Sequence, residues 1–161
     1  MSHPIPHYSV PDIEYLNEIE FKSITNDDAV ALGLIAIHVI QEWDLNLAVE
    51  IVLGRDVVFK AKLKSTNADN DPWLAGKAEV AKRFGEPSLL VKLRHLTAGT
   101  PFEERTDVDH DTYKAHGGSI PLRVDDSIVG TITMSGEPDA IDHEAAAETL
   151  ARFVRSRNPS F

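Results

Sequence analysis

Lys77 has the most unusual position for its residue type in this sequence. One face of an expected helix has the spacing i, i+4, i+7 and i+11 and consists of Trp73, Lys77, Val80 and Phe84. A lysine therefore lies within an apolar stripe. Such lysines more often bury the stem and let the ammonium reach water at the edge of the core. The alternative is a lysine in a cleft, where the ammonium binds a ligand carboxylate or has a lowered pKa. This alternative makes Lys77 a candidate ligand-binding residue.

The segment His116-Gly117-Gly118 is a second candidate. It lies between an expected short helix, Asp109–His116, and a strand that begins at Ser119. Two glycines allow positive φ and let another group approach the backbone closely, and their amides can form a concavity that accepts an anion. A helix C-cap followed by a turn explains the glycines equally well. At the end of a helix, the dipole would favour the charged form of His116.

His143 is the third candidate, on an expected helix that begins near Asp139. It shares a helix face with three apolar residues, Ala147, Leu150 and Val154. A single histidine on such a face is more often a hydrogen-bonded core residue than a ligand. His116 and His143 with Asp142 would suit a borderline metal or one axial haem ligand, but their separation of 27 residues specifies neither. We therefore predict no metal site.

Composition and missing motifs narrow the function classes. The chain has 161 residues, 16 Lys+Arg against 26 Asp+Glu, a net charge of −10 and no cysteine. Without cysteine there are no disulfides, thiolate metal sites, iron–sulfur clusters or cysteine nucleophiles. The negative balance argues against nucleic acid as a partner. The motifs G-x-S-x-G, G-x-x-x-x-G-K-[ST] and G-x-G-x-x-G do not occur, so hydrolase, NTPase and dinucleotide-dependent functions have no support. The sequence therefore identifies no catalytic residue, and any catalytic residues are unknown.

We expect a cytoplasmic protein without a membrane partner. The longest apolar run, Ala29–Ile40, has 12 residues, fewer than the ~20 that a membrane span needs. The first ten residues, MSHPIPHYSV, have neither the basic n-region nor the apolar h-region of a secretory signal. They also lack periodicity, so we expect a flexible arm over residues 1–10 and a single domain over residues 11–161.

Helices and one hairpin are expected in the first half of that domain. A short helix is expected over Pro11–Ile19, and Thr25 with Asp28 resembles the capping box of an almost wholly apolar helix that ends at Trp43. The alternation over Leu45–Leu63 predicts a hairpin. Keeping its apolar residues on one face requires a three-residue loop, Gly54-Arg55-Asp56. This register places Leu53 opposite Val57, and Glu50 opposite Lys60 on the solvent face.

The second half repeats this pattern of helices followed by a hairpin. Asp71, as an N-cap before Pro72, indicates the start of a helix that ends at Gly85. Next come a helix over Pro87–Thr97, whose apolar face is Leu89, Leu93 and Leu96, and a polar loop over Thr100–Asp111. A second hairpin is expected from Ser119–Val124 and Ser127–Ser135, around Asp125-Asp126. Tight hairpins flanked by helices indicate an α+β fold with a mainly antiparallel sheet.

Three ordered blocks carry a family resemblance. They are Asn70-Asp71-Pro72-Trp73 with Gly76-Lys77; His116-Gly117-Gly118-Ser119-Ile120-Pro121; and Val129-Gly130-Thr131-Ile132 through Ser135-Gly136 to Asp142-His143. In this order they resemble an uncharacterised branch of the haem-degrading-domain (GlcG/HbpS-like) superfamily, over about residues 21–153. The resemblance implies a profilin-like fold, an antiparallel sheet flanked by helices, in a homo-oligomer. Gly76 and Glu137 depart from the family pattern, which has arginine or asparagine and an apolar residue at these positions.

Two functions fit these observations. The first is a small-molecule-binding domain, with haem or a related anionic ligand as the candidate. Lys77 would pair with a propionate, His116 or His143 would offer an axial nitrogen, and Gly117 and Gly118 would let the ligand approach. The second is a non-catalytic homo-oligomeric protein-interaction module in which these residues are structural. We prefer the first, because an interaction module has no need of a cation at Lys77.

Overall fold

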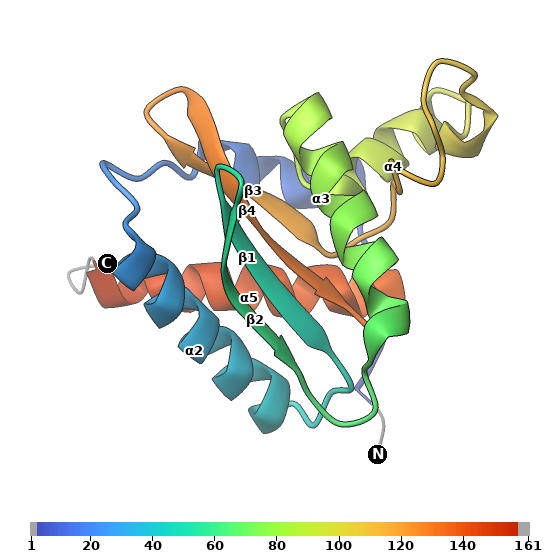
Figure 1. Ribbon diagram of the computed structural model, residues 1–161. Coiled ribbons are helices and arrows are strands. Elements are labelled where there is room, and N and C mark those ends of the chain that lie inside the picture. Colours follow the sequence, from blue (N-terminus) through green and yellow to red (C-terminus); the bar gives the residue numbers. More distant parts are fainter. Residues whose placement is uncertain (1–2, 158–161) are drawn as a thin grey trace.

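The computed structural model describes residues 3–157, in which a four-stranded sheet has helices on both faces (Figure 1). The strands are β1 (Ala48–Leu53), β2 (Asp56–Lys62), β3 (Ser119–Val124) and β4 (Ser127–Ser135), antiparallel throughout in the order β2-β1-β4-β3. The helices are α1 (Val10–Ile13), α2 (Asn26–Glu42), α3 (Asp71–Phe84), α4 (Ser88–Thr97) and α5 (Asp139–Arg157), and 3-10 turns cover Glu14–Glu18, Ala68–Asn70 and Phe102–Glu104. The expected α+β class, a profilin-like antiparallel sheet flanked by helices, is confirmed.

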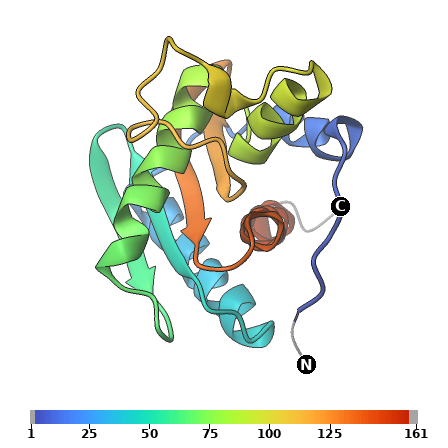
Figure 2. The same cartoon turned by 90° about the vertical axis from the view of Figure 1, so that its right-hand side faces the viewer.

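The apolar face of the sheet packs against α2 and α5. Because side chains alternate along a strand, β1 turns Val49 and Ile51 to this face and β4 turns Ile132 and Met134 to it, and all four are fully buried. Figure 2 views α5 end-on, with β4 between α5 and α3. The main hydrophobic core therefore lies on the α2 and α5 side of the sheet.

The opposite face of the sheet is polar and packs against α3. Its buried residues include Glu50, Thr131, Thr133 and Ser119, which alternate with the apolar set. Thr133 Oγ1 donates to Ser119 Oγ over 2.9 Å, and the Ser119 N–H donates to Ser88 Oγ over 3.0 Å. The expected Glu50–Lys60 pair forms, with 3.2 Å between charged atoms, but Glu50 is only 9% exposed, so this face is not the solvent face that the pattern predicts.

The loop of the first hairpin is shorter than predicted. Leu53 pairs with Asp56, which leaves a two-residue turn, Gly54-Arg55, instead of three residues. A bulge follows on β2, because Val52 pairs with Val57 while Ile51 pairs with Phe59. The extra residue restores the apolar alternation beyond it. The prediction was wrong because it considered only the loop as the place where register can change.

Strong local signals are confirmed elsewhere. Thr25 caps α2, accepting a hydrogen bond from the Asp28 N–H at 3.1 Å while the Asp28 carboxylate accepts from the Thr25 N–H at 2.8 Å. Gly85 ends α3 with a φ of +70°. The second hairpin has the predicted strands and turn. The short helix predicted over Pro11–Ile19 is present as α1 and the 3-10 turn after it.

Three other expectations were wrong. The segment Asp109–His116 contains turns and no helix, since the Lys114 N–H donates to the Gly76 carbonyl of α3 at 3.0 Å. Asp71 is the first residue of α3 and not its N-cap; its carboxylate pairs with two β2 lysines, Lys60 and Lys62, at 2.8 and 3.1 Å. Leu96 is 50% exposed instead of facing the core.

The N-terminal segment lies along α5. His3 Nε2 pairs with the Glu144 carboxylate over 2.5 Å, and the Tyr8 ring packs edge-on against His143 with 5.1 Å between ring centres. Figure 2 shows this segment on the side of α5 away from the sheet. The division into a flexible arm (residues 1–10) and a domain (residues 11–161) stays a prediction. Within the described residues, no helix is long and apolar enough to cross a membrane.

Candidate ligand-binding site

A buried ion pair joins α3 to α5. Lys77 Nζ lies 2.8 Å from Asp142 Oδ2 and donates a second hydrogen bond to the Met134 carbonyl at 3.0 Å. The two residues are 3% and 1% exposed. The ammonium is therefore held by protein groups below the surface, and the more common interpretation of a lysine in an apolar stripe was wrong. α3 lies over the polar face of the sheet, where a carbonyl and a carboxylate replace water around the ammonium.

Asp142 is held on both carboxylate oxygens. Oδ2 faces Lys77, and Oδ1 accepts a hydrogen bond from the Glu137 N–H at 3.0 Å. Burial raises the pKa of Asp142 to about 6, because the cost of desolvating the carboxylate exceeds the stabilisation by Lys77. At pH 7 the group is ionised and the contact is an ion pair. Replacing a buried ion pair by packed apolar residues is often neutral or stabilising. Folding stability alone therefore does not explain why these two charges are buried here.

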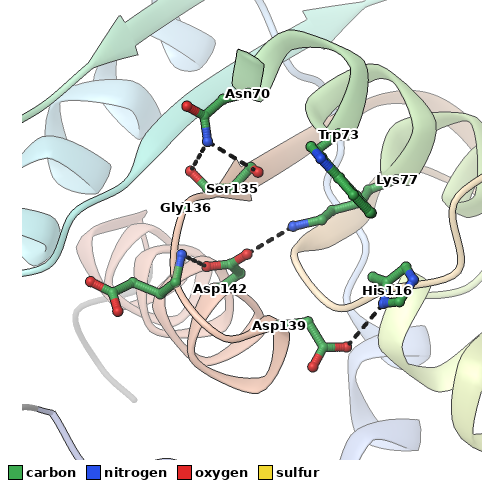
Figure 3. A pocket seen from close by; sticks show the side chains of 9 residues that line it. Asn70, Trp73, Lys77, His116, Ser135, Gly136, Asp139 and Asp142 are labelled. Carbon is green, nitrogen blue, oxygen red and sulfur yellow. Dashed lines mark hydrogen bonds and ion pairs between the residues drawn. The ribbon is translucent and has the colours of Figure 1, made fainter. Parts of the chain in front are cut away.

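An open pocket of about 360 Å³, here called the site pocket, lies above the ion pair (Figure 3). Its lining comes from three regions: α3 and the residue before it, the end of β4 and the following segment with the first turn of α5, and the residue before the two glycines. The lining residues are Asn70, Trp73, Lys77, His116, Ser135, Gly136, Glu137, Asp139 and Asp142. Lys77 and Asp142 are the only members that are both charged and fully buried, so they form its floor.

His116 is on the wall of this pocket, beside Asp139. Its Nδ1 lies 3.9 Å from Asp139 Oδ2, and its ring packs edge-on against Trp73 with centres 5.4 Å apart. Burial, followed by the nearby Lys92 ammonium, lowers the pKa of His116 below its usual value, so the imidazole is neutral at pH 7. The expected helix dipole favouring the charged form is absent, because no helix precedes His116.

Asp139 connects the wall to the loop before β3. It accepts hydrogen bonds from the Gly117 N–H at 3.0 Å and from Lys92 Nζ at 2.9 Å. Burial opposes ionisation, but these two donors together lower the pKa of Asp139. The Asp139 carboxylate is therefore ionised at pH 7 and fixed by two donors. In this position it can orient the His116 ring.

The two glycines meet protein atoms. A Cβ at Gly117 would lie 2.3 Å from the Asp139 carbonyl oxygen, and one at Gly118, whose φ is +137°, would lie 2.3 Å from the Met134 carbonyl oxygen and 3.0 Å from Lys77 Nζ. The atoms that approach Gly117 and Gly118 closely thus belong to the polypeptide around the ion pair. Neither glycine lines the site pocket.

His143 lies outside the site pocket. It is 1% exposed, it packs against Tyr8, and its Nδ1 has no hydrogen-bond partner among the described residues. Burial lowers the pKa of His143 to about 4. The structure thus brings Lys77 and His116 to one pocket and does not bring His143 to it. Within residues 3–157, no three His, Asp or Glu side chains are grouped to hold a metal ion.

Sequence reasoning did not assign several lining residues to a site. Asn70 donates long hydrogen bonds, 3.4 and 3.5 Å, to the carbonyl and hydroxyl of Ser135 (Figure 3), and Trp73 stands at the mouth with 42% of its surface exposed. Both belong to the sequence blocks that carry the family resemblance, as does Ser135. That signal was available, but nothing in the spacing says that these blocks meet in space.

The family model described as "Haem degrading protein HbpS-like" matches residues 24–151. The chain belongs to the HbpS-like family. The predicted resemblance is therefore confirmed. A UPF0303 protein of Streptomyces coelicolor is 39% identical over 151 residues, covering 91% of this chain and 96% of that protein.

Solved structures share this fold. The crystal structure of the Ybr137w protein matches with a TM-score of 0.79 and 26% identity, over 91% of this chain and 88% of that one. A PduOC:heme complex matches with a TM-score of 0.66 and 18% identity, over 80% of this chain and 94% of that one. At 18% identity the second likeness shows a shared fold alone.

Proposed function

We propose that this HbpS-like chain binds a small molecule in the site pocket, with haem as the candidate ligand. The observation that supports this most is the fully buried Lys77–Asp142 ion pair at the floor of an open pocket. Buried charges beside a cleft are typical of functional sites. The pocket volume, about 360 Å³, falls within the range of roughly 300–1,000 Å³ for small-molecule sites.

The residues fit haem in one respect and differ from the expected arrangement in another. His116 offers a half-buried, neutral imidazole, the form that ligates iron. Lys77, in contrast, is already neutralised by Asp142, and Glu137 and Asp139 add negative charge to the lining, so Lys77 is a poor partner for a propionate. In this proposal His116 holds the iron, Lys77 and Asp142 shape the floor, and Gly117, Gly118 and His143 support the pocket by packing. Bound haem would supply an iron centre for electron or oxygen chemistry.

A haem titration followed by absorbance in the Soret region tests this proposal. Wild-type protein is expected to give a saturating shift, which His116→Ala removes and added imidazole partly restores in the cavity of His116→Gly. The matched control is His38→Ala, since His38 is exposed on α2 with 76% of its side chain accessible. Absence of a shift in the wild type, or an unchanged spectrum in His116→Ala, would refute haem binding through His116.

A homo-oligomeric interaction module is the second candidate function, and exposed apolar side chains on two elements support it. Val30 and Leu34 are 39% and 58% exposed one turn apart on α2, and Val57 on the edge strand β2 is 56% exposed. Native mass spectrometry of protein purified without added cofactor separates the two functions. A ligand retained at fixed stoichiometry supports the site pocket. An oligomer that carries no ligand and gives no Soret shift with haem supports the interaction module. A monodisperse monomer at micromolar concentration contradicts the interaction module.

A further inference from the structure

A second hollow, here called the aromatic hollow, lies on the other side of Trp73 and His116 from the site pocket. It has a volume of about 390 Å³ and is lined by Trp73, Phe102, Glu103, His110, Tyr113, Lys114, Ala115 and His116. Part of its wall is apolar: Phe102 and Ala115 are 3% and 2% exposed and belong to a small hydrophobic cluster of their own. This cluster is separate from the main core under α2 and α5.

Lys114 brings an ammonium group to this apolar surface. Its Nζ lies 4.8 Å from the centre of the Trp73 ring. Across the described residues no carboxylate pairs with it, and its one hydrogen bond is a long contact of 3.4 Å to the His110 carbonyl. The ammonium thus differs from that of Lys77, which has a carboxylate at 2.8 Å. A half-buried cation without an anion partner is the group that a ligand carboxylate would meet.

Gly76 on α3 fixes where Lys114 points. A Cβ at position 76 would lie 2.6 Å from Lys114 Cγ and 2.7 Å from its Cδ, so the lysine stem crosses the helix where a side chain is missing. The Lys114 N–H also donates to the Gly76 carbonyl at 3.0 Å. These contacts restrict the lysine stem, and a restricted cation loses less side-chain entropy when it binds an anion.

We propose that the aromatic hollow is a binding site for a small aromatic carboxylate of one or two rings. The ring system packs against Phe102, Tyr113 and Ala115, and the carboxylate pairs with Lys114. Two of the other titratable groups of the lining are already hydrogen-bonded or exposed to solvent. The His110 ring nitrogen Nε2 donates to the Arg105 carbonyl at 2.8 Å, and Glu103 is exposed to solvent. Arg83, whose guanidinium lies 5.1 Å from the Tyr113 ring centre, adds positive charge at this edge.

This proposal goes beyond the proposed function, because it concerns a different hollow and a different cation. It holds or fails without reference to haem or to His116 as a ligand. Trp73 and His116 line both hollows, so the two candidate sites are neighbours.

A pair of isosteric probes, 2-naphthoate and the neutral 2-naphthamide, tests the carboxylate site. We expect ligand-observed NMR titration of the full chain to show about tenfold tighter binding of the carboxylate, the lower end for a charge-assisted hydrogen bond at a partly exposed site. Lys114→Met should reduce this preference to about onefold, and Lys114→Arg should keep most of it. Gly76→Ala should reduce it as well, by displacing the lysine stem.

The matched control is Lys82→Met, which removes an exposed α3 lysine whose partner is Glu79 and should leave the preference unchanged. Intermolecular nuclear Overhauser effects between the naphthalene protons and the rings of Tyr113 and Phe102 would locate the probe. Equal affinity for the two probes in the wild type, a preference that survives Lys114→Met, or no binding of either probe at millimolar concentration would each overturn the proposal.

Discussion

Replacing Asp142 by Asn would leave the Lys77 ammonium buried with the Met134 carbonyl as its one strong acceptor. Breaking a buried ion pair from one side costs about 3–5 kcal/mol. Because an asparagine oxygen still accepts a hydrogen bond, we expect the lower end for Asp142→Asn, about 3 kcal/mol. For a chain of this length that loss corresponds to a fall in Tm of roughly 6–12 °C.

Lys77→Met leaves the complementary group, a buried carboxylate. Burial already raises the pKa of Asp142 to about 6 with the lysine present, and removing the lysine raises it further. An acid whose folded-state pKa is raised loses stability as pH rises above its unfolded value, because the folded state then binds more protons than the unfolded state. Lys77→Met should therefore cost more free energy of unfolding at pH 8 than at pH 5.

A double-mutant cycle measures how far the two groups depend on each other. Urea unfolding followed by circular dichroism at pH 7.5 is expected to show Lys77→Met/Asp142→Leu at least about 2 kcal/mol more stable than the summed losses of Lys77→Met alone and Asp142→Leu alone predict. The exposed Lys82–Glu79 pair on α3, with side chains 39% and 38% accessible, is the matched control and should show a coupling below about 1 kcal/mol. Single changes costing less than about 1 kcal/mol, or additive losses, would refute the role assigned to the buried pair.

Four further substitutions test other parts of the structure. Burial lowers the pKa of His143 from 6.5 to about 4, so the wild type loses stability as pH falls below 6.5. His143→Phe should gain about 2 kcal/mol relative to wild type between pH 7.5 and pH 5 by urea unfolding, and parallel pH profiles would contradict this. Gly118→Ala, with its Cβ 2.3 Å from a carbonyl oxygen, should cost at least about 2 kcal/mol in thermal unfolding. Gly99→Ala, with nothing within 4 Å, should cost about 1 kcal/mol, and equal losses would refute the steric argument. Thr25→Ala should cost about 1 kcal/mol through the lost α2 cap without changing the haem titration.

Elements specified by neighbouring residues could be predicted from the sequence. The capping box of Thr25 and Asp28 lies within one helical turn, and the β3–β4 hairpin follows from alternation around two aspartates. Asp125 adopts a φ of +54° in that turn, a conformation that aspartate tolerates. In each case the groups that satisfy the backbone are a few residues away, so the pattern contains the whole explanation.

Features that depend on distant residues could not be predicted in this way. The partner of Lys77 is 65 residues away, so the stripe showed an anomalous lysine and not its carboxylate. The segment before His116 is not helical because Lys114 bonds to Gly76, 38 residues earlier in the chain. The bulge on β2 compensates for a short turn. Each outcome is set by a tertiary contact that outweighs the local preference.

The two faces of the sheet explain why the site pocket lies where it does. One face buries Ile51, Ile132 and their neighbours under α2 and α5, and this packing supplies the main hydrophobic stabilisation. The other face carries Glu50, Thr131 and Thr133, which need hydrogen bonds and contribute less by burial. α3 covers that polar face, so charged groups can be placed under it without disrupting the main core. Substitutions in the site pocket or the aromatic hollow should therefore change ligand affinity with little loss of folding stability. The buried Lys77–Asp142 pair is the exception, because it joins α3 to α5.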